Sequence, residues 1–231
     1  MMRRSRARPL AQVSMLAVLF NVCFTMISVA QGSQAPDAQI RIVAFGDSLT
    51  AGFGLQPGQA FPAQLEKALK ARGHPVEVIN AGVSGDTTAA GLRRFDWAIP
   101  DDVDAAIVAL GANDALRGID PAQSRQNLDK ILAKLDSKGV AVLLAGMKAP
   151  RNWGEGYVKR FDSLFPELAE KHGALLYPFF LESVALQSAL NLDDGMHPNA
   201  KGVEAMVTAM LPKVEELIAR AKAKQKPAIA N

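Results

Sequence analysis

Cysteine is nearly absent from this 231-residue chain, since Cys23 is the only one. It lies within an apolar stretch near the amino terminus, so the remainder of the chain has no thiol for a disulfide or a thiolate metal site. Histidine is also scarce, and the three that occur are far apart in the sequence. They form no cluster with the spacing of metal ligands. The sequence therefore predicts a function that uses neither a metal ion nor an organic cofactor.

Acidic residues are missing before Asp37, where arginines crowd the start and a largely apolar stretch follows from Leu10 to Ala30. A basic start, an apolar segment and small residues before a cleavage point are typical of a secretory signal peptide. We therefore predict a signal peptide over residues 1–30, with a second acceptable cleavage point after Ala35. The protein is then periplasmic or secreted. An uncleaved membrane anchor is the alternative, although polar residues interrupt the apolar stretch.

Excess positive charge belongs mostly to this leader. The formal charge of +3 becomes −1 when the four leader arginines are removed, and these are Arg3, Arg4, Arg6 and Arg8. The body carries no basic patch, which argues against a nucleic-acid partner. Neither repeats nor linkers divide residues 36–231. We expect one domain with a short basic carboxy-terminal tail, a monomer that binds a small molecule and is not inserted in a membrane after cleavage.

Short apolar runs alternate with amphipathic stretches of helical length from Ile40 onward, as expected for βα units on a parallel sheet. Five strands are predicted, at Ile40–Phe45, Val76–Asn80, Ala105–Leu110, Val140–Ala145 and Ala174–Tyr177. Helices are predicted at Phe61–Ala71, Thr87–Trp97, Gln123–Leu135, Tyr157–His172 and Ala200–Ala223, the last with Pro212 in its interior as a source of a kink. The fold class is therefore α/β with a five-stranded parallel sheet.

Ligands of such sheets bind at the carboxyl ends of the strands. Polar, glycine-rich clusters follow four of the predicted strands, namely Gly46-Asp47-Ser48-Leu49, Ala81-Gly82-Val83-Ser84-Gly85-Asp86, Gly111-Ala112-Asn113-Asp114 and Asp194-Gly195-Met196-His197-Pro198. All four clusters are expected at one edge of the sheet. This edge is where we look for a site.

A serine in the first cluster and a histidine in the last form a candidate nucleophile and base. Ser48 needs a neighbouring base to take its proton, and His197 can supply it with Asp194 as the carboxylate that orients the imidazole. Each residue also has a plain structural interpretation, because Asp47 and Ser48 are ordinary helix caps and Asp194 and His197 could cap the last helix. The other two histidines, His74 and His172, lie at turns and are interpreted as structural.

A tetrahedral oxyanion needs hydrogen-bond donors, and the same edge offers three: the N–H groups of Ser48 and Gly82 and the side-chain amide of Asn113. Taken alone, Gly82 fits a tight turn and Asn113 a buried amide that satisfies loop backbone. Asp47, Asp86 and Asp114 are interpreted as carboxylates that brace these loops.

The four clusters, in this order, resemble the sequence blocks of the SGNH or GDSL hydrolases, whose name lists serine, glycine, asparagine and histidine. The resemblance runs from about Arg41 to the final helix and is similar in detail to the acyl-CoA thioesterase I, lysophospholipase L1 and arylesterase branch. It implies a flavodoxin-like three-layer α/β/α sandwich. It also implies Ser48, His197 and Asp194 as a catalytic triad, with Ser48, Gly82 and Asn113 as the oxyanion hole.

The expected activity is hydrolysis of carboxylic esters with aryl or short to medium acyl groups through an acyl-enzyme, with thioesters and lysophospholipids as further substrates. A carbohydrate O-deacetylase is the alternative enzyme, and a non-catalytic glycan- or lipid-binding module is the alternative from another class. Candidate substrate contacts are Phe53, Leu116, Tyr157 and Phe179. Core packing explains these four residues equally well, because pockets and cores use the same residue types.

Overall fold

The computed structural model describes residues 39–225. Residues 1–38, which include the predicted signal peptide, lie outside the described part. So do residues 226–231 at the end of the basic tail. None of the helices in residues 39–225 is both long and apolar enough to cross a bilayer.

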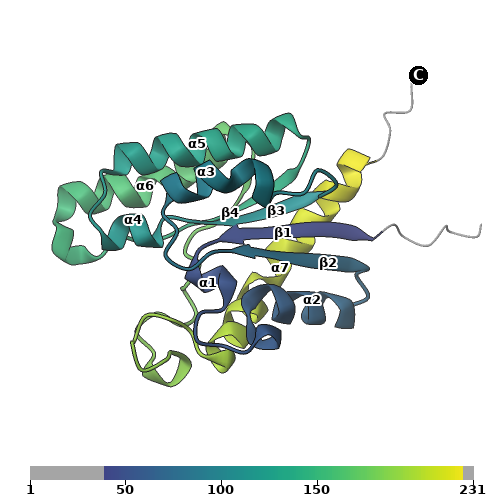
Figure 1. The fold of residues 1–231 in the computed structure, drawn as a ribbon, viewed down its shortest axis with the longest axis horizontal. Coiled ribbons are helices and arrows are strands. Elements are labelled where there is room, and N and C mark those ends of the chain that lie inside the picture. The colour runs from purple at the N-terminus through teal and green to yellow at the C-terminus, as the bar shows by residue number, and fades with distance from the viewer. Residues whose placement is uncertain (1–38, 226–231) are drawn as a thin grey trace, which may run out of the picture. The chain divides into compact units, whose positions relative to one another are not determined.

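A sheet of five parallel strands forms the centre of the domain, in the order β2-β1-β3-β4-β5 (Figure 1). The strands are β1 Ile40–Gly46, β2 Val76–Gly82, β3 Ala105–Ala109, β4 Ala141–Ala145 and β5 Leu175–Tyr177. All five residues of β3 are buried, as expected for a central strand covered on both faces. The predicted α/β class and all five strands are confirmed.

Helices cover both faces of the sheet, which makes the three layers of an α/β/α sandwich (Figure 1). On one face lie α2 Phe61–Ala71 and α7 Ala200–Gln225; on the other lie α3 Thr88–Ala98, α5 Pro121–Ser137 and α6 Glu155–Lys171. Three single turns of 3-10 helix occur at Pro57–Gln59, Arg151–Trp153 and Ser188–Leu190. The α7 helix continues past Pro212 and is not divided there.

Two short helices lie outside the predicted helix ranges: α1 Ser48–Ala51, of which the sequence indicated only the cap, and α4 Ala112–Leu116. Both directly follow strand ends, where the sequence analysis placed loops. A side chain starts α1, because Asp47 accepts the Leu49 N–H at 3.0 Å. The α4 helix is preceded by Gly111 at φ 122°, a backbone angle that L side chains rarely adopt. Helices of four and five residues are too short to show a helical period in the sequence.

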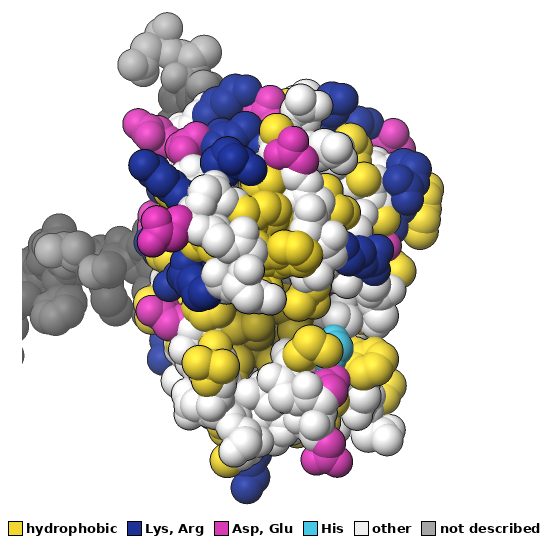
Figure 2. All heavy atoms as spheres, turned by 90° about the vertical axis from the view of Figure 1, so that its left-hand side faces the viewer, with side chains coloured by type: hydrophobic (Ala, Val, Ile, Leu, Met, Phe, Trp, Pro, Cys, Tyr) yellow, Lys and Arg dark blue, Asp and Glu magenta, His cyan; other side chains and the backbone are white. Residues whose placement is uncertain are grey.

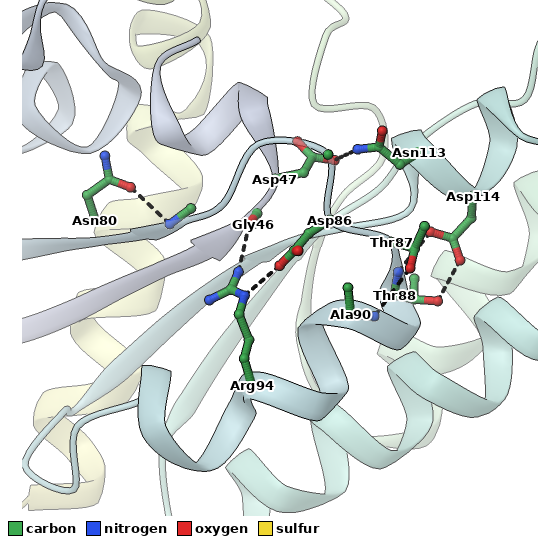
Figure 3. A network of polar contacts seen from close by, with 12 residues as sticks. Gly46, Asp47, Asn80, Asp86, Thr87, Thr88, Ala90, Arg94, Asn113 and Asp114 are labelled. Carbon is green, nitrogen blue, oxygen red and sulfur yellow. Dashed lines mark hydrogen bonds and ion pairs between the residues drawn. The ribbon is translucent and has the colours of Figure 1, made fainter.

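A buried ion pair between α3 and the loop after β2 lies close to the end of β1 (Figure 3). The Arg94 side chain on α3 donates from Nε to Asp86 Oδ2 at 2.5 Å and from Nη2 to the Gly46 carbonyl at 2.9 Å. Its guanidinium also lies 4.3 Å from the ring centroid of Phe45. One side chain thus fixes both the last residue of β1 and the loop that follows β2.

We expect Arg94→Met to destabilise the fold by about 3–5 kcal/mol, because it leaves the Asp86 carboxylate buried without its partner. Urea unfolding at neutral pH measures this loss. Arg93→Met, at the exposed neighbouring position of the same helix, is the matched control. Equal unfolding midpoints for the two variants would contradict the role given to the ion pair.

Candidate active site

Ser48 is the first residue of α1, directly after β1 and its cap Asp47. Small residues allow this helix to lie close to the sheet. A Cβ on Gly46 would stand 2.1 Å from Thr50 Oγ1, and a Cβ on Gly82 would stand 2.3 Å from the backbone nitrogen of Ala51. Glycine is therefore required at both strand ends for Ser48 to occupy its place at the edge of the sheet.

His197 lies between Ser48 and Asp194. Its Nε2 is 2.9 Å from Ser48 Oγ, and its Nδ1 is 2.6 Å from Asp194 Oδ2. The structure thus brings together the three residues of the predicted triad in a serine–imidazole–carboxylate chain. Each distance is that of a direct hydrogen bond.

The Asp194 carboxylate is held by its own loop. Its Oδ1 accepts the N–H groups of His197 and Met196, each at 2.9 Å. These bonds, with that to the His197 side chain, lower the pKa of Asp194 to about 2. Gly195, at φ 69°, allows the tight turn between Asp194 and His197. The carboxylate is therefore ionised at neutral pH and fixed against the imidazole.

Gly82 does not offer a free N–H in this structure. Its N–H donates to Asn80 Oδ1 of the same strand at 3.0 Å (Figure 3). The hydrogen that was predicted to bind an oxyanion therefore already has an acceptor. Gly85, three residues later, lies in a turn at φ 84°. Its N–H has no acceptor within residues 39–225. The sequence contains both glycines in one cluster and gives no means to choose between them.

Asn113 is placed by α4, and Arg117 of the same short stretch connects it to Gly85. Arg117 Nη2 donates to the Gly85 carbonyl at 3.0 Å and lies 3.5 Å from Asn113 Oδ1. The nitrogen of the same side-chain amide, Asn113 Nδ2, is 3.5 Å from Asp47 Oδ2. Arg117 was missed in the sequence analysis, since an exposed arginine at a helix end has no distinguishing local signal.

A pocket of about 340 Å³ opens beside Ser48 and His197. Its wall is mainly apolar, and Figure 2 shows hydrophobic side chains gathered in a hollow on this face, at the carboxyl ends of the strands. Of the four predicted substrate contacts, Leu116 and Phe179 line the pocket. The other apolar lining residues missed by the sequence analysis include Met147, Leu181, Val184 and Leu186.

Phe53 and Tyr157 are not part of the pocket wall. The Phe53 ring instead packs on the His197 imidazole, with 4.5 Å between ring centroids. Tyr157 lies between the rings of Trp153 and Phe161 and donates its hydroxyl to the Ile119 carbonyl at 2.8 Å. Tyr157, on α6, therefore packs against the loop after α4, which agrees with the structural alternative for it.

Within residues 39–225, no group of three His, Cys, Asp or Glu side chains is arranged to hold a metal ion. His74 and His172 are remote from Ser48 and pair with Glu215 and Asp129, at 3.2 Å and 2.6 Å. Their structural interpretation agrees with these contacts.

Comparison with known proteins identifies the family. A model described as the GDSL-like lipase/acylhydrolase family matches residues 44–205. The chain belongs to this family. Among curated relatives, it is 34% identical to esterase TesA of Pseudomonas aeruginosa over 88% of this chain and all of the relative. It is 37% identical to an arylesterase of Vibrio mimicus, over 80% of this chain and 90% of the relative.

The chain is also 33% identical to a thioesterase 1/protease 1/lysophospholipase L1 of Escherichia coli, over 77% of this chain and 84% of the relative. Among solved structures, the SGNH-hydrolase family esterase AlinE4 is 49% identical, with a TM-score of 0.67 over 79% of this chain and 98% of that one. The GDSL family and the SGNH fold predicted from the sequence are confirmed, and the chain is a carboxylic ester hydrolase.

Asp47, the aspartate of this hydrolase's Gly46-Asp47-Ser48-Leu49 block, is completely buried. Burial raises the pKa of Asp47 to about 6, against the lowering effect of the Leu49 N–H that it accepts. An acid whose pKa is higher in the folded state stabilises the fold while protonated and loses that contribution as the pH rises between the unfolded and folded values. For Asp47 this window runs from its ordinary 3.8 to about 6.

We therefore expect the unfolding free energy of the wild type, relative to Asp47→Asn, to fall by about 2 kcal/mol from pH 4 to pH 7. Urea unfolding of both proteins across this range measures the difference, and any pH-independent cost of the substitution cancels. Asp194→Asn is the control, because the lowered pKa of Asp194 confines its own effect to more acidic solution. A constant difference between wild type and Asp47→Asn would refute the expectation.

Proposed function

We propose that this hydrolase is a serine esterase that cleaves aryl and short to medium acyl esters through an acyl-enzyme, with acyl thioesters and lysophospholipids as further substrates. The observation that carries the proposal is His197, which contacts Ser48 Oγ with one ring nitrogen and Asp194 with the other. This is the arrangement that a serine nucleophile requires. The names of the relatives, which include esterase, arylesterase and thioesterase, support the same substrate range.

In the proposed cycle, His197 Nε2 takes the proton of Ser48 Oγ while the oxygen attacks the ester carbonyl carbon. The tetrahedral intermediate collapses, His197 gives the proton to the leaving oxygen or sulfur, and the alcohol or thiol departs. Water then attacks the acyl-serine with the same imidazole as base. Asp194 stays ionised throughout and holds Nδ1–H toward itself, which leaves Nε2 directed at Ser48.

The proposed oxyanion hole consists of the Ser48 N–H, the Asn113 side-chain amide and the N–H of Gly85 in place of Gly82. Gly85 is favoured because its N–H is free while that of Gly82 is bonded to Asn80. The bonds from Arg117 support the pairing, since they hold the Gly85 peptide beside the Asn113 amide. Preorganised donors of this kind stabilise the oxyanion without rearrangement.

Export to the periplasm or the exterior is part of the proposal. It rests on the signal peptide predicted over residues 1–30 and is tested by finding the mature chain, sequenced from its amino terminus, in the periplasm or the medium.

We expect Ser48→Ala and Asp194→Asn each to reduce kcat by about 10⁴-fold or more while leaving the thermal midpoint close to that of the wild type. The measurement is hydrolysis of a panel of p-nitrophenyl esters and acyl thioesters of graded length. Acetylated sugars in the same panel separate an esterase from an O-deacetylase. Full activity of Asp194→Asn would remove it from the triad, and full activity of Ser48→Ala would refute the nucleophile.

For Arg117→Met we expect kcat to fall about ten- to a hundredfold with little change in KM, because it releases two oxyanion donors that matter most in the transition state. Arg117→Lys should recover part of the loss, and added guanidinium should raise the activity of Arg117→Ala. Since the side chain is exposed, the thermal midpoint should not change. A rise in KM with kcat intact would instead place Arg117 in substrate binding.

A further inference from the structure

The pocket beside Ser48 carries charge of one sign. Its lining includes no aspartate or glutamate, and its ionisable side chains are His197, which belongs to the triad, and Lys148. The rest of the wall is apolar or uncharged. One unassigned cation therefore faces a space that the proposed function fills with substrate.

Lys148 is fixed at its backbone. It is the exposed residue between Met147 and Ala149, which are buried at 3% and 4% exposure. The Ala149 N–H donates to Asp162 Oδ1 at 2.9 Å, which ties this loop to α6. The residue thus projects from a held segment directly after β4 rather than from a free surface loop.

The side chain of Lys148 is also guided. Its Nζ lies 5.1 Å from the ring centroid of Phe179, another residue of the pocket wall. An ammonium over an aromatic face is attracted to the ring. This contact keeps the charge at the wall of the pocket.

No carboxylate of residues 39–225 pairs with Lys148. The nearby Asp162, which could neutralise a cation here, pairs instead with Arg151 at 3.1 Å and accepts the Ala149 N–H. A cation that faces a low-polarity pocket without a counter-ion favours an anion there. Residues 39–225 supply no such anion to Lys148, so an anionic group of a bound ligand can take that position.

We propose that Lys148 is a subsite for an anionic group, a carboxylate or a phosphate, carried by the ester substrate near the scissile carbonyl. This inference rests on the proposed function and adds a charge preference to it. The anion has two sources: a carboxylate at the far end of the acyl chain, or a phosphate on the leaving group. In either position Nζ binds it by charge and hydrogen bonding while Ser48 attacks the carbonyl.

Matched substrate pairs test the subsite. In the acyl arm, a p-nitrophenyl monoester of a dicarboxylic acid is compared with the ester of the monocarboxylic acid of equal chain length. In the leaving-group arm, a monoacylglycerol phosphate is compared with the monoacylglycerol of the same chain, both as monomers. The readout is the ratio of kcat/KM for the anionic substrate to kcat/KM for the neutral one. General damage to the enzyme cancels in this ratio.

Lys148→Gln should lower the ratio about fivefold in at least one arm, and Lys148→Glu should lower it further. Added salt should reduce the ratio of the wild type and leave that of Lys148→Gln unchanged. Lys130→Gln, an exposed lysine on α5 outside the pocket, should keep both substrates at wild-type rates. The arm that responds identifies the source of the anion. Equal ratios for the wild type, Lys148→Gln and Lys148→Glu in both arms would overturn the subsite.

Binding separates this inference from the proposed function. In the Ser48→Ala background, the Kd for the monoacylglycerol phosphate and for the dicarboxylic monoester is measured by calorimetry with and without Lys148→Gln. Weaker binding of either ligand with Lys148→Gln supports the subsite even if turnover does not require Ser48. Unchanged binding of both ligands counts against it even if the esterase mechanism holds.

Discussion

The bond between Arg94 and the Gly46 carbonyl is the constraint on which the placement of Ser48 depends. The same carbonyl accepts the Val83 N–H at 3.0 Å, so the last residue of β1 is joined to α3 and to the loop after β2. Ser48 follows two residues later, within a helix too short to hold a position by itself. The buried ion pair with Asp86 then carries the loop that includes Gly85. The positions of Ser48 and of Gly85, the proposed oxyanion donor, therefore both depend on one guanidinium.

A second buried carboxylate positions Asn113 in a similar manner. Asp114 is fully buried and accepts the Thr88 N–H at 2.8 Å, the Thr88 hydroxyl at 2.6 Å and the Ser124 hydroxyl at 2.9 Å. Three elements, α3, α4 and α5, therefore meet at one side chain. Buried polar groups are costly unless satisfied, so such a network fixes a single arrangement. Together with Asp47 and Asp86, Asp114 acts as the loop brace expected from the sequence.

The sequence was sufficient to predict the sheet and to place Ser48, Asp194 and His197 at one edge of it, since strand periodicity and position at the strand ends are local properties. It could not decide between two residues of one type within a cluster. Gly82 and Gly85 differ in the direction of an N–H and in the side-chain oxygen of Asn80, which only the folded backbone determines. Tyr157 lies outside the pocket wall for a related reason, because an aromatic residue near the edge packs against neighbours as readily as it lines a pocket. Arg117 stands out because it bonds to Gly85, which is distant in the sequence, and Lys148 because no carboxylate of residues 39–225 pairs with it. Neither property can be read from the sequence.

His197 and the pocket wall are linked through one connection, the segment between β5 and α7. It contributes Leu181, Val184 and Leu186 to the pocket wall and then turns back to present Asp194 and His197. Two asparagine side chains hold this segment through hydrogen bonds to its backbone. Asn191 Nδ2 donates to the carbonyls of Val184 and Gln187. Asn199 Nδ2 donates to those of Ala189 and Asn191.

Leu186 shows the consequence of this arrangement. It adopts φ 64°, which disfavours a leucine, and its side chain is fully exposed at the pocket wall. Strain of this kind persists where surrounding bonds over-determine the backbone. Because the same bonds hold the segment that carries His197, we expect a change that relaxes Leu186 and widens the pocket also to loosen the position of His197. Substrate range is therefore more freely altered at Leu116, which lines the same pocket from α4 and not from the segment that carries His197.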